Sequence, residues 1–463
     1  MGSTSPAPGK TERAALSLEG MTRSVEVPEL ANPLRRYGAF AGPALLVSVG
    51  YMDPGNWGTD LQAGAQYQYG LLWVVALASL MAIVLQALAA RLGVASGKDL
   101  AQACREWYPA WTRYPQWILC EIAVGACDLA EVLGGAVALN LLFHIPIIWA
   151  VLITACDVFL LLALRGVGMR AIEAVVGVLV ATIGICYFIE IFMLPKTAPD
   201  FAGLGDAMLH PAVSSIGMAT VAIGIIGATV MPHNLYLHSA LVQTRKLSMG
   251  KDAKGSAIRF YSLDTVVALG IAFFVNAAIL VLAALVFYGK DSVTIDGQIY
   301  LFNQDTDWIR VAYFTLAPLL GTSAASLLFA IALLASGQSS TITGTLAGQV
   351  VMEGFLGWRV KPWIRRLATR ALAILPAILV IGFRGGEKIN DLLVLSQVVL
   401  ALQLPFAMFP LLHFASRRKF MGAWRGSPPL LIAGWTSAIL ITAMDIYGLP
   451  DALADAWHFV QGG

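Results

Sequence analysis

The sequence predicts an all-α polytopic membrane protein of eleven spans, built as two five-span repeats of opposite orientation and one additional span. Three observations predict this fold. Apolar residues make up 58% of the 463 residues and charged residues only 13%, whereas a soluble domain typically carries about 25% charged residues. Two apolar segments are each interrupted by a proline with polar neighbours, and basic residues are concentrated in alternate loops.

The first interruption lies in the apolar segment 39–70, at Asp53-Pro54-Gly55-Asn56. Pro54 has no N–H to donate and its ring crowds the preceding turn, and Gly55 favours non-helical backbone. The backbone carbonyls freed at this depth need a partner, because hydrocarbon offers none. A cation is one such partner, and the Asp and Asn side chains beside the break would suit it.

A second interruption of the same kind breaks the apolar segment 213–242, at Met231-Pro232-His233-Asn234. When the two prolines are aligned, Asn56 matches Asn234 and Asp53 falls opposite Met231. Two broken segments at corresponding positions of two halves indicate the binding site of a transporter. The alternative is that each proline only kinks a helix, but a kink does not require the neighbouring polar side chains.

The other spans follow from counting segments of about 20 apolar residues. Spans 1–5 and 6–10 are equal and odd in number, so the second half enters the membrane from the opposite side. A polar amphipathic stretch, 98–107, lies between spans 2 and 3. Beyond the two broken segments, the expected spans are 71–93, 117–143, 146–164, 169–194, 260–288, 323–352, 366–383, 389–414 and 429–448.

The loops predict the orientation. With a cytosolic N-terminus, nineteen Lys and Arg residues fall in inside loops and five in outside loops, which is a strong positive-inside bias. The C-terminus is then extracytoplasmic. Residues 1–36 are polar and are expected to form a disordered cytosolic tail, residues 37–448 the transmembrane domain, and residues 449–463 a short extracytoplasmic tail.

The side chains at the two breaks differ in chemical softness. Asp53 offers a hard anionic oxygen, Asn56 a neutral oxygen and Met231 a soft thioether. Oxygen ligands alone would suit Mg²⁺ or Ca²⁺, whereas sulfur shifts the preference toward transition metals and cadmium. Methionine more often fills cores, so the position of Met231 opposite Asp53 is what favours a ligand role.

Five motifs together resemble the Nramp family of divalent metal transporters, and the resemblance covers residues 38–448. It implies the LeuT fold, with broken helices 1 and 6, and proton-coupled symport of Mn²⁺ or Fe²⁺, and also of Cd²⁺ and Co²⁺, into the cytosol. The motifs are Gly42-Pro43, Asp53-Pro54-Gly55-Asn56, Asp128-Leu129-Ala130-Glu131, Met231-Pro232-His233-Asn234 and Gly337-Gln338-Ser339-Ser340.

By position, the resemblance also implies site residues. The implied metal ligands are Asp53, Asn56, Met231, the backbone carbonyls of Ala228 and Gly50, and Gln397. At residue 50 glycine replaces the more usual alanine, and Cys127 stands where threonine is common. The implied proton route is lined by Asp53, His233, Asp128, Glu131, Arg370 and Arg245.

Alternatives remain for these polar residues. Asp128 and Glu131 share one face of span 3, and a structural ion pair with Arg370 or Arg245 would also satisfy them. His233 can titrate or can simply be packed. Five further acidic residues are expected to be structural or interfacial: Asp157, Glu173, Glu190, Asp264 and Asp445.

Rival functions lack matching features. A sodium-coupled organic solute symporter of the same fold would favour small residues at the breaks, and a metal-sensing receptor would need a large soluble domain. The sequence has no H-E-x-x-H run and no P-loop, so neither an enzyme nor an ATP-driven pump is predicted. No cofactor, nucleic-acid partner or obligate oligomer is expected. The expected partners are a divalent metal ion, a proton and the lipid bilayer of the plasma or inner membrane.

Overall fold

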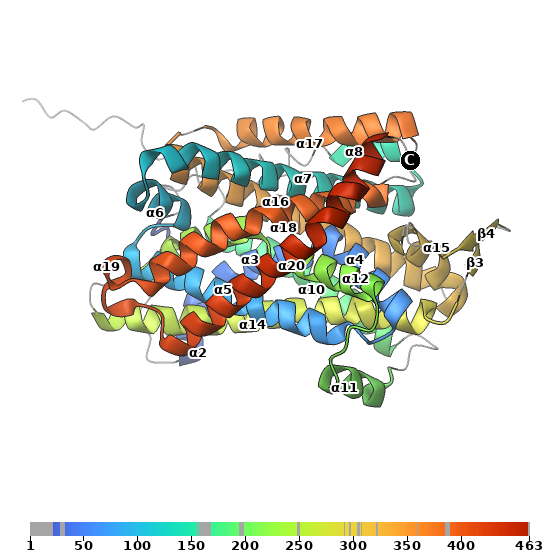
Figure 1. The fold of residues 1–463 in the computed structure, drawn as a ribbon, viewed down its shortest axis with the longest axis horizontal. Helices are drawn as coiled ribbons and strands as arrows, with labels where there is room; N and C mark the ends of the chain where they lie inside the picture. The colour runs from blue at the N-terminus through green and yellow to red at the C-terminus, as the bar shows by residue number, and fades with distance from the viewer. Residues whose placement is uncertain are drawn as a thin grey trace, which may run out of the picture.

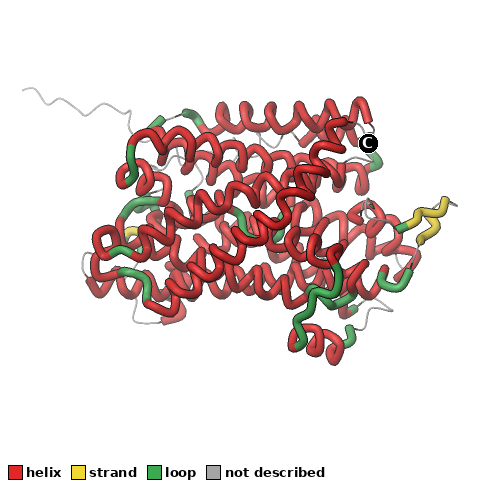
Figure 2. The backbone as a smooth tube through the Cα atoms, viewed as in Figure 1, coloured by secondary structure: helices red, strands yellow, loops and turns green. Residues whose placement is uncertain are grey.

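The computed structural model describes residues 22–27, 33–154, 156, 168–193, 199–247, 251–290, 292–295, 298–302, 306, 308–320, 323–358, 360–384 and 389–461. Long helices run side by side along the molecule (Figure 1). Strands are confined to short pairs (Figure 2). Helices α2 (Pro33–Phe40), α6 (Leu100–Trp107) and α19 (Arg418–Met421) lie at one end of the molecule. Helices α11 (Phe201–Leu209) and α15 (Trp308–Leu320) and the hairpin of β3 (Ser292–Ile295) and β4 (Gln298–Leu301) lie toward the other (Figure 1).

The first half of the chain forms one broken helix and helices of the next four predicted spans, of which the fourth is described as a helix only as far as Thr154. The break separates α3 from α4, with a single 3-10 turn, η1, between them. The elements are β1 (Val25–Glu26), α2 (Pro33–Phe40), α3 (Pro43–Ser48), η1 (Val49–Tyr51), α4 (Pro54–Tyr67), α5 (Leu72–Ser96), α6 (Leu100–Trp107), η2 (Ala110–Thr112), α7 (Arg113–Phe143), α8 (Ile147–Thr154) and α10 (Met169–Phe192).

The second half repeats this order and adds a last helix. Its broken helix is the pair α12 and α13. The elements are α11 (Phe201–Leu209), α12 (Ile216–Thr229), α13 (Pro232–Leu241), η3 (Val242–Thr244), β2 (Arg245–Lys246), α14 (Lys251–Phe287), β3 (Ser292–Ile295), β4 (Gln298–Leu301), α15 (Trp308–Leu320), α16 (Ser323–Leu356), α17 (Pro362–Arg384), α18 (Ile389–Ser416), α19 (Arg418–Met421), η5 (Gly422–Trp424) and α20 (Pro428–Gln461).

Short local signals set the ends of these helices. α5 stops at Gly97, which adopts the left-handed conformation with φ 69°, as helix C-termini commonly do. The predicted amphipathic stretch forms α6. Asp99 caps its N-terminus, and the Gln102 side chain reciprocates in a capping box. α7 ends at His144, also left-handed, just before Pro146.

Eight helices within the described residues are long and apolar enough to cross a membrane. The other three predicted spans differ for separate reasons. The first is divided between α3 and α4, each too short alone, and the apolar part of α17 covers only Leu367–Leu379. The fourth begins as α8, and its remainder, with Asp157, lies outside the described residues.

The tails and loops carry structure that composition did not predict. Residues 22–27 fall within the predicted disordered tail, yet β1 pairs in parallel with β2, Val25 opposite Arg245. Arg23 N donates to Gln243 O at 2.9 Å, and Val25 is buried, so pairing and burial order this segment. Residues 1–21 of that tail lie outside the described residues. At the other terminus, α20 continues to Gln461, through most of the predicted tail.

Glycine lets the helices around the breaks approach closely. A Cβ added at Gly64 of α4 would lie 2.1 Å from the carbonyl oxygen of Leu280 in α14. A Cβ at Gly93 of α5 would lie 2.2 Å from the carbonyl oxygen of Ser239 in α13. Each broken helix is therefore held against an unbroken one by backbone contact, the packing that small residues permit in membranes.

We expect Gly64→Ala to destabilise the protein by about 1 to 3 kcal/mol, because the added methyl group would overlap backbone that cannot move aside. The matched control is Gly270→Ala in α14, where nothing lies within 4 Å of the added Cβ. That change should be neutral or slightly stabilising. Thermal unfolding of the purified variants, followed by tryptophan fluorescence, makes the comparison. Equal melting temperatures for the two variants would contradict the close-packing interpretation.

Candidate functional site

The first break places a carboxylate at the start of a helix. α3 ends at Ser48, η1 turns the chain, and Asp53 becomes the N-cap of α4 in extended conformation, followed by Pro54. The Asp53 Oδ1 atom accepts hydrogen bonds from the Asn56 backbone N at 3.0 Å and from Asn56 Nδ2 at 2.7 Å. Pro54 needs no such partner, since the first helical position has no intrahelical acceptor for its N–H.

Neighbouring helices supply donors for carbonyls freed at this break. Tyr51 O accepts from Asn276 Nδ2 of α14 at 2.8 Å. Met52 O accepts from Trp57 Nε1 at 3.2 Å and from Ser336 Oγ of α16 at 2.5 Å. The unwound backbone is therefore fixed by side chains of both repeats, which satisfies groups that lipid could not.

The second break has the same geometry with a different side chain. α12 ends at Thr229, and Met231 is the extended N-cap of α13, directly before Pro232. Met231 thus takes the position that Asp53 takes before Pro54, which confirms the predicted alignment of the two broken helices. Unlike Asp53, Met231 makes no side-chain capping hydrogen bond, because a thioether is only a weak acceptor.

Asn56 joins the two breaks. Its Nδ2 atom donates to the backbone carbonyl of Ala228 at 3.2 Å, and its Oδ1 atom accepts from Thr229 Oγ1 at 3.3 Å. Asp53 and Met231 are both 0% exposed. The Asp53 Oδ2 atom is buried and has no hydrogen-bond partner among the described residues, so an anionic oxygen is available at the junction of the two breaks.

The other predicted ligands also lie around this junction, and each makes a different contact there. Met231 packs with Cys127 and Leu400 in a small buried cluster. A Cβ at Gly50 would meet Asn234 Nδ2 at 2.1 Å, so the Asn234 amide fills the space that the more usual alanine would need. Gln397 of α18 lies against Gly55, where an added Cβ would be 2.1 Å from its Nε2 atom.

A cavity of about 90 Å³ reaches this junction from one side of α4. Its wall includes Gly55, Gly58 and Gln62 of α4, and Gln397 of α18. The opposite side of α4 is packed: Trp57 lies 5.3 Å from the rings of Tyr187 and Phe329. α4 therefore separates this small cavity, lined largely by small residues, from the protein core.

The acidic pair of α7 lies in a hydrogen-bonded pocket made by α16 and α17. Glu131 accepts from Ser340 Oγ at 3.0 Å and from Thr341 Oγ1 at 3.1 Å, and it forms an ion pair with Arg370 at 3.4 Å. Arg370 also donates to the backbone carbonyl of Asp128 at 2.8 Å. Cys127 Sγ donates to Glu131 Oε1 at 3.5 Å and packs against Met231 at the second break. The pair is thus in contact with an arginine on one side and, through Cys127, with the second break on the other.

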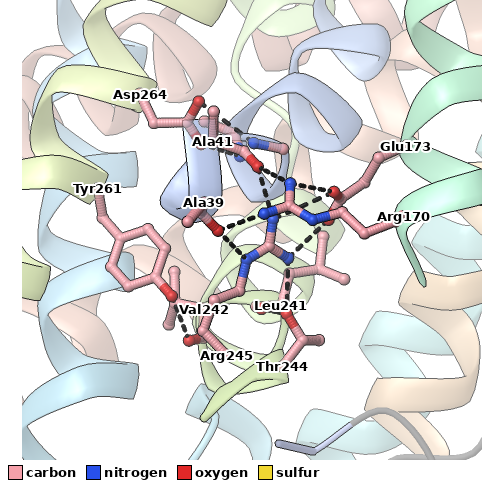
Figure 3. A network of polar contacts seen from close by, with 12 residues as sticks. Ala39, Ala41, Arg170, Glu173, Leu241, Val242, Thr244, Arg245, Tyr261 and Asp264 are labelled. Atoms are coloured by element: carbon pink, nitrogen blue, oxygen red, sulfur yellow. Dashed lines mark hydrogen bonds and ion pairs between the residues drawn. The ribbon is translucent and has the colours of Figure 1, made fainter. Parts of the chain in front are cut away.

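Arg245 lies in a different network (Figure 3), beside the end of α2, where its Nε atom donates to Ala39 O at 3.4 Å. It contacts Glu173 of α10 at 2.6 and 3.1 Å and donates to Ala41 O at 2.5 Å. Of the two arginines proposed as partners for the α7 acids, the structure brings only Arg370 to them. Arg245 is held elsewhere because Glu173, predicted to be structural, faces it.

The same network holds the chain just before α3. Arg170 donates to Ala41 O at 2.7 Å and to Glu173 at 3.1 Å, and also contacts Ala39 O. The Asp264 carboxylate of α14 accepts from the backbone N of Ala44 at 3.0 Å. Side chains of α10, α14 and β2 therefore converge on one short backbone segment (Figure 3).

A polar bridge that sequence reasoning missed connects the two broken helices. Gln86 of α5 donates to Tyr51 Oη at 2.7 Å and contacts His238 Nδ1 of α13 at 3.0 Å. All three side chains are buried. The available signal was a single amide in the otherwise apolar span 71–93. His233, by contrast, has a buried Nδ1 atom without a hydrogen-bond partner among the described residues.

Comparison with known proteins gives matches over nearly the whole chain. The family model described as natural resistance-associated macrophage protein-like matches residues 44–451. A divalent metal cation transporter MntH from a Nostoc species is 49% identical over 439 residues, 94% of this chain and 96% of that protein. The corresponding MntH of Mesorhizobium japonicum is 48% identical over 96% of each chain.

Solved structures of transporters also match nearly the whole chain. A crystal structure of the Eremococcus coleocola manganese transporter matches with a TM-score of 0.85 at 36% identity, over 95% of this chain and 92% of that one. Mhp1, a nucleobase-cation-symport-1 family transporter, matches with a TM-score of 0.54 at 15% identity, over 91% and 93% of the two chains. These matches confirm the predicted LeuT-like fold of two inverted five-helix repeats and an eleventh helix.

We expect Arg245→Gln to loosen the segment 37–52, because it removes the buried one of the two arginines that join Glu173 to the Ala41 carbonyl. Hydrogen exchange of that segment should accelerate, since local opening needs fewer broken contacts. The matched control is Arg170→Gln, which leaves the two Arg245–Glu173 contacts in place and should have a smaller effect. Unchanged exchange in Arg245→Gln, or a larger increase in the control, would contradict this role.

Proposed function

The chain belongs to the natural resistance-associated macrophage protein-like (Nramp) family, and on that premise we propose that it carries divalent transition-metal ions, chiefly Mn²⁺ or Fe²⁺, into the cytosol by alternating access. The observation that carries this proposal is the junction of the two broken helices. There the Asp53 Oδ2 atom, which has no hydrogen-bond partner among the described residues, lies with the Asn56 amide and the Ala228 carbonyl. At the second break Met231 occupies the position before the helix that Asp53 occupies at the first.

The proposed ligand set combines one charge with neutral donors. Asp53 supplies the anionic oxygen, Asn56 and the Ala228 and Gly50 carbonyls supply neutral oxygens, and Met231 supplies sulfur. Gln397 would approach the ion from the cavity side. Among the described residues, no three His, Cys, Asp or Glu side chains cluster as a metal site. One carboxylate with neutral ligands suits transient binding of a cargo ion, whose release needs a weak site.

We further propose that a proton accompanies the metal. His233, Asp128 and Glu131 would lead from the breaks toward Arg370, and a metal ion that binds the Asp53 carboxyl would displace its proton, which these side chains could accept. In this proposal the basic end of the molecule, with α2, α6 and α19, faces the cytosol, following the positive-inside rule. The N-terminus is then cytosolic, the C-terminus is extracytoplasmic, and a single chain suffices.

The first of three predictions about transport concerns the charge at the first break. Asp53→Asn should abolish Mn²⁺ uptake, because the ion loses its only anionic ligand, while the asparagine oxygen can still cap α4. Asp53→Ala should abolish uptake as well and in addition lose about 1 kcal/mol of stability with the cap. Uptake into proteoliposomes and thermal unfolding separate the two effects. Mn²⁺ uptake at the wild-type rate in Asp53→Asn would show that the proposed site is wrong.

The second prediction concerns coupling. Glu131→Gln keeps the shape of the side chain but removes a titratable group, so uptake should depend less on pH and voltage, with a smaller loss of metal binding. Thr341→Val is the control, since it removes one donor to the same carboxylate without removing a charge. Uptake with a pH-sensing dye inside the vesicles reports both fluxes. If binding and coupling fall equally in Glu131→Gln, the pair is a structural one.

The third prediction concerns selectivity. Met231→Ala leaves only oxygen ligands, so Cd²⁺ uptake should fall steeply, Mn²⁺ uptake should fall less, and exclusion of Ca²⁺ and Mg²⁺ should relax. The control is Met52→Ala, which removes an equally buried thioether at the first break. Met52 packs in the main core, whereas Met231 packs beside Cys127. Competition of each ion with labelled Mn²⁺ gives the answer, and an unchanged ratio of Cd²⁺ to Ca²⁺ inhibition would contradict a sulfur filter.

A further inference from the structure

A large cavity lies far along α18 from the metal junction, where that helix ends. It has a volume of about 770 Å³, within the usual range for ligand sites. The chain turns sharply around it: α18 ends at Ser416, α19 follows, and the Gly426 backbone N donates to Ala415 O at 3.1 Å before α20 begins. The cavity therefore lies at the α2, α6 and α19 end of the molecule (Figure 1).

One wall of this cavity is cationic. Arg417, Arg418 and Arg425 line it, all three are exposed, and none of the described residues that line it is acidic. The ion pairs formed between described residues include none of these three guanidinium groups. Three arginines on one short loop make a strong local positive field, and the planar guanidinium matches phosphate oxygens in pairs of hydrogen bonds.

The other wall is aromatic and holds its shape through internal contacts. Trp435 Nε1 of α20 donates to Ser416 Oγ at 3.2 Å, and the Trp435 ring lies 6.0 Å from that of Phe409. Tyr108, at the end of α6, stacks on His413 at 5.7 Å and shares a 3.0 Å hydrogen bond with its Nδ1 atom. Three helices are thus tied together around the cavity before anything binds.

Apolar side chains continue from the aromatic wall away from the arginines. On α18, Leu402, Phe406 and Phe409 follow at helical spacing, with 36%, 48% and 36% of their surface exposed. On α20, Ile432 and Ile439 flank Trp435 and are 67% and 61% exposed. These stripes would face the hydrocarbon of a bilayer, while tryptophan and arginine are the residues that prefer its polar boundary.

We propose that this cavity is a binding site for the headgroup of an anionic phospholipid. The phosphodiester would lie among Arg417, Arg418 and Arg425, and the acyl chains would lie along the exposed apolar stripes of α18 and α20. Basic pockets between transmembrane helices bind anionic headgroups for these reasons. A bound lipid would join α18, which carries Gln397, to α20 at the membrane surface. The site involves none of the proposed metal or proton residues.

Native mass spectrometry of the full-length protein tests this. The protein is titrated with phosphatidylglycerol or with phosphatidylcholine of identical acyl chains. We expect the first phosphatidylglycerol to bind much more tightly than phosphatidylcholine. Arg417→Gln/Arg418→Gln/Arg425→Gln should weaken phosphatidylglycerol binding by about 100-fold. The control Lys98→Gln/Arg105→Gln/Lys246→Gln removes the same charge at the same end of the molecule, outside the cavity, and should bind as the wild type does.

Three results would overturn the proposal. They are unchanged phosphatidylglycerol binding in the triple variant, equal loss in the control, and displacement of the lipid by inorganic phosphate at the same concentration, which would indicate a free-anion site. If the triple variant does not fold, Arg417→Gln and Arg425→Gln are titrated singly. Each must then weaken phosphatidylglycerol binding while leaving phosphatidylcholine binding unchanged, and failure of both would equally overturn the site.

Discussion

Backbone polar groups released inside a membrane must find partners in the protein, and the core of this molecule is arranged around that requirement. At the first break, α14, α16 and α4 each send a donor to a freed carbonyl. These donors fix where the three helices can lie. Asn56 extends the arrangement to the second break through the Ala228 carbonyl. The proposed cargo ion would complete a set of polar contacts that the protein satisfies only in part.

The first broken helix and the chain that leads into it are held by different forces. α4 is held by packing, with Gly64 against the α14 backbone and Trp57 between two rings. The chain before α3 is held by ions, with Arg245 and Arg170 on its carbonyls and Asp264 on its amide groups. α3 itself is also packed, with Leu46 and Val47 fully buried in the main core. The charged contacts therefore act on the residues that lead into α3, while packing holds both pieces of the broken helix.

The features that could be predicted from the sequence are those that depend on local chemistry. Proline fixed both helix starts, so Asp53 and Met231 could be matched, and the three-residue spacing put Asp128 and Glu131 on one face. Sequence reasoning could not decide between Arg370 and Arg245, because both occupy suitable depths and only tertiary packing turns Arg245 toward Glu173. The β1–β2 pairing was equally invisible, since a two-residue strand in a polar tail has no periodicity. Gln86 carried a signal, a lone amide in an apolar span, but nothing in the sequence indicated its partners.

The Gln86 bridge has a consequence for the histidine it contacts. Its amide nitrogen is committed as the donor to Tyr51, so the oxygen must face His238 and can only accept. The proton of the neutral imidazole is thereby fixed on Nδ1, and the lone pair is left on Nε2, which is buried without a hydrogen-bond partner among the described residues. A side chain that never ionises thus selects one tautomer of a buried base and leaves that base a single atom at which to gain a proton.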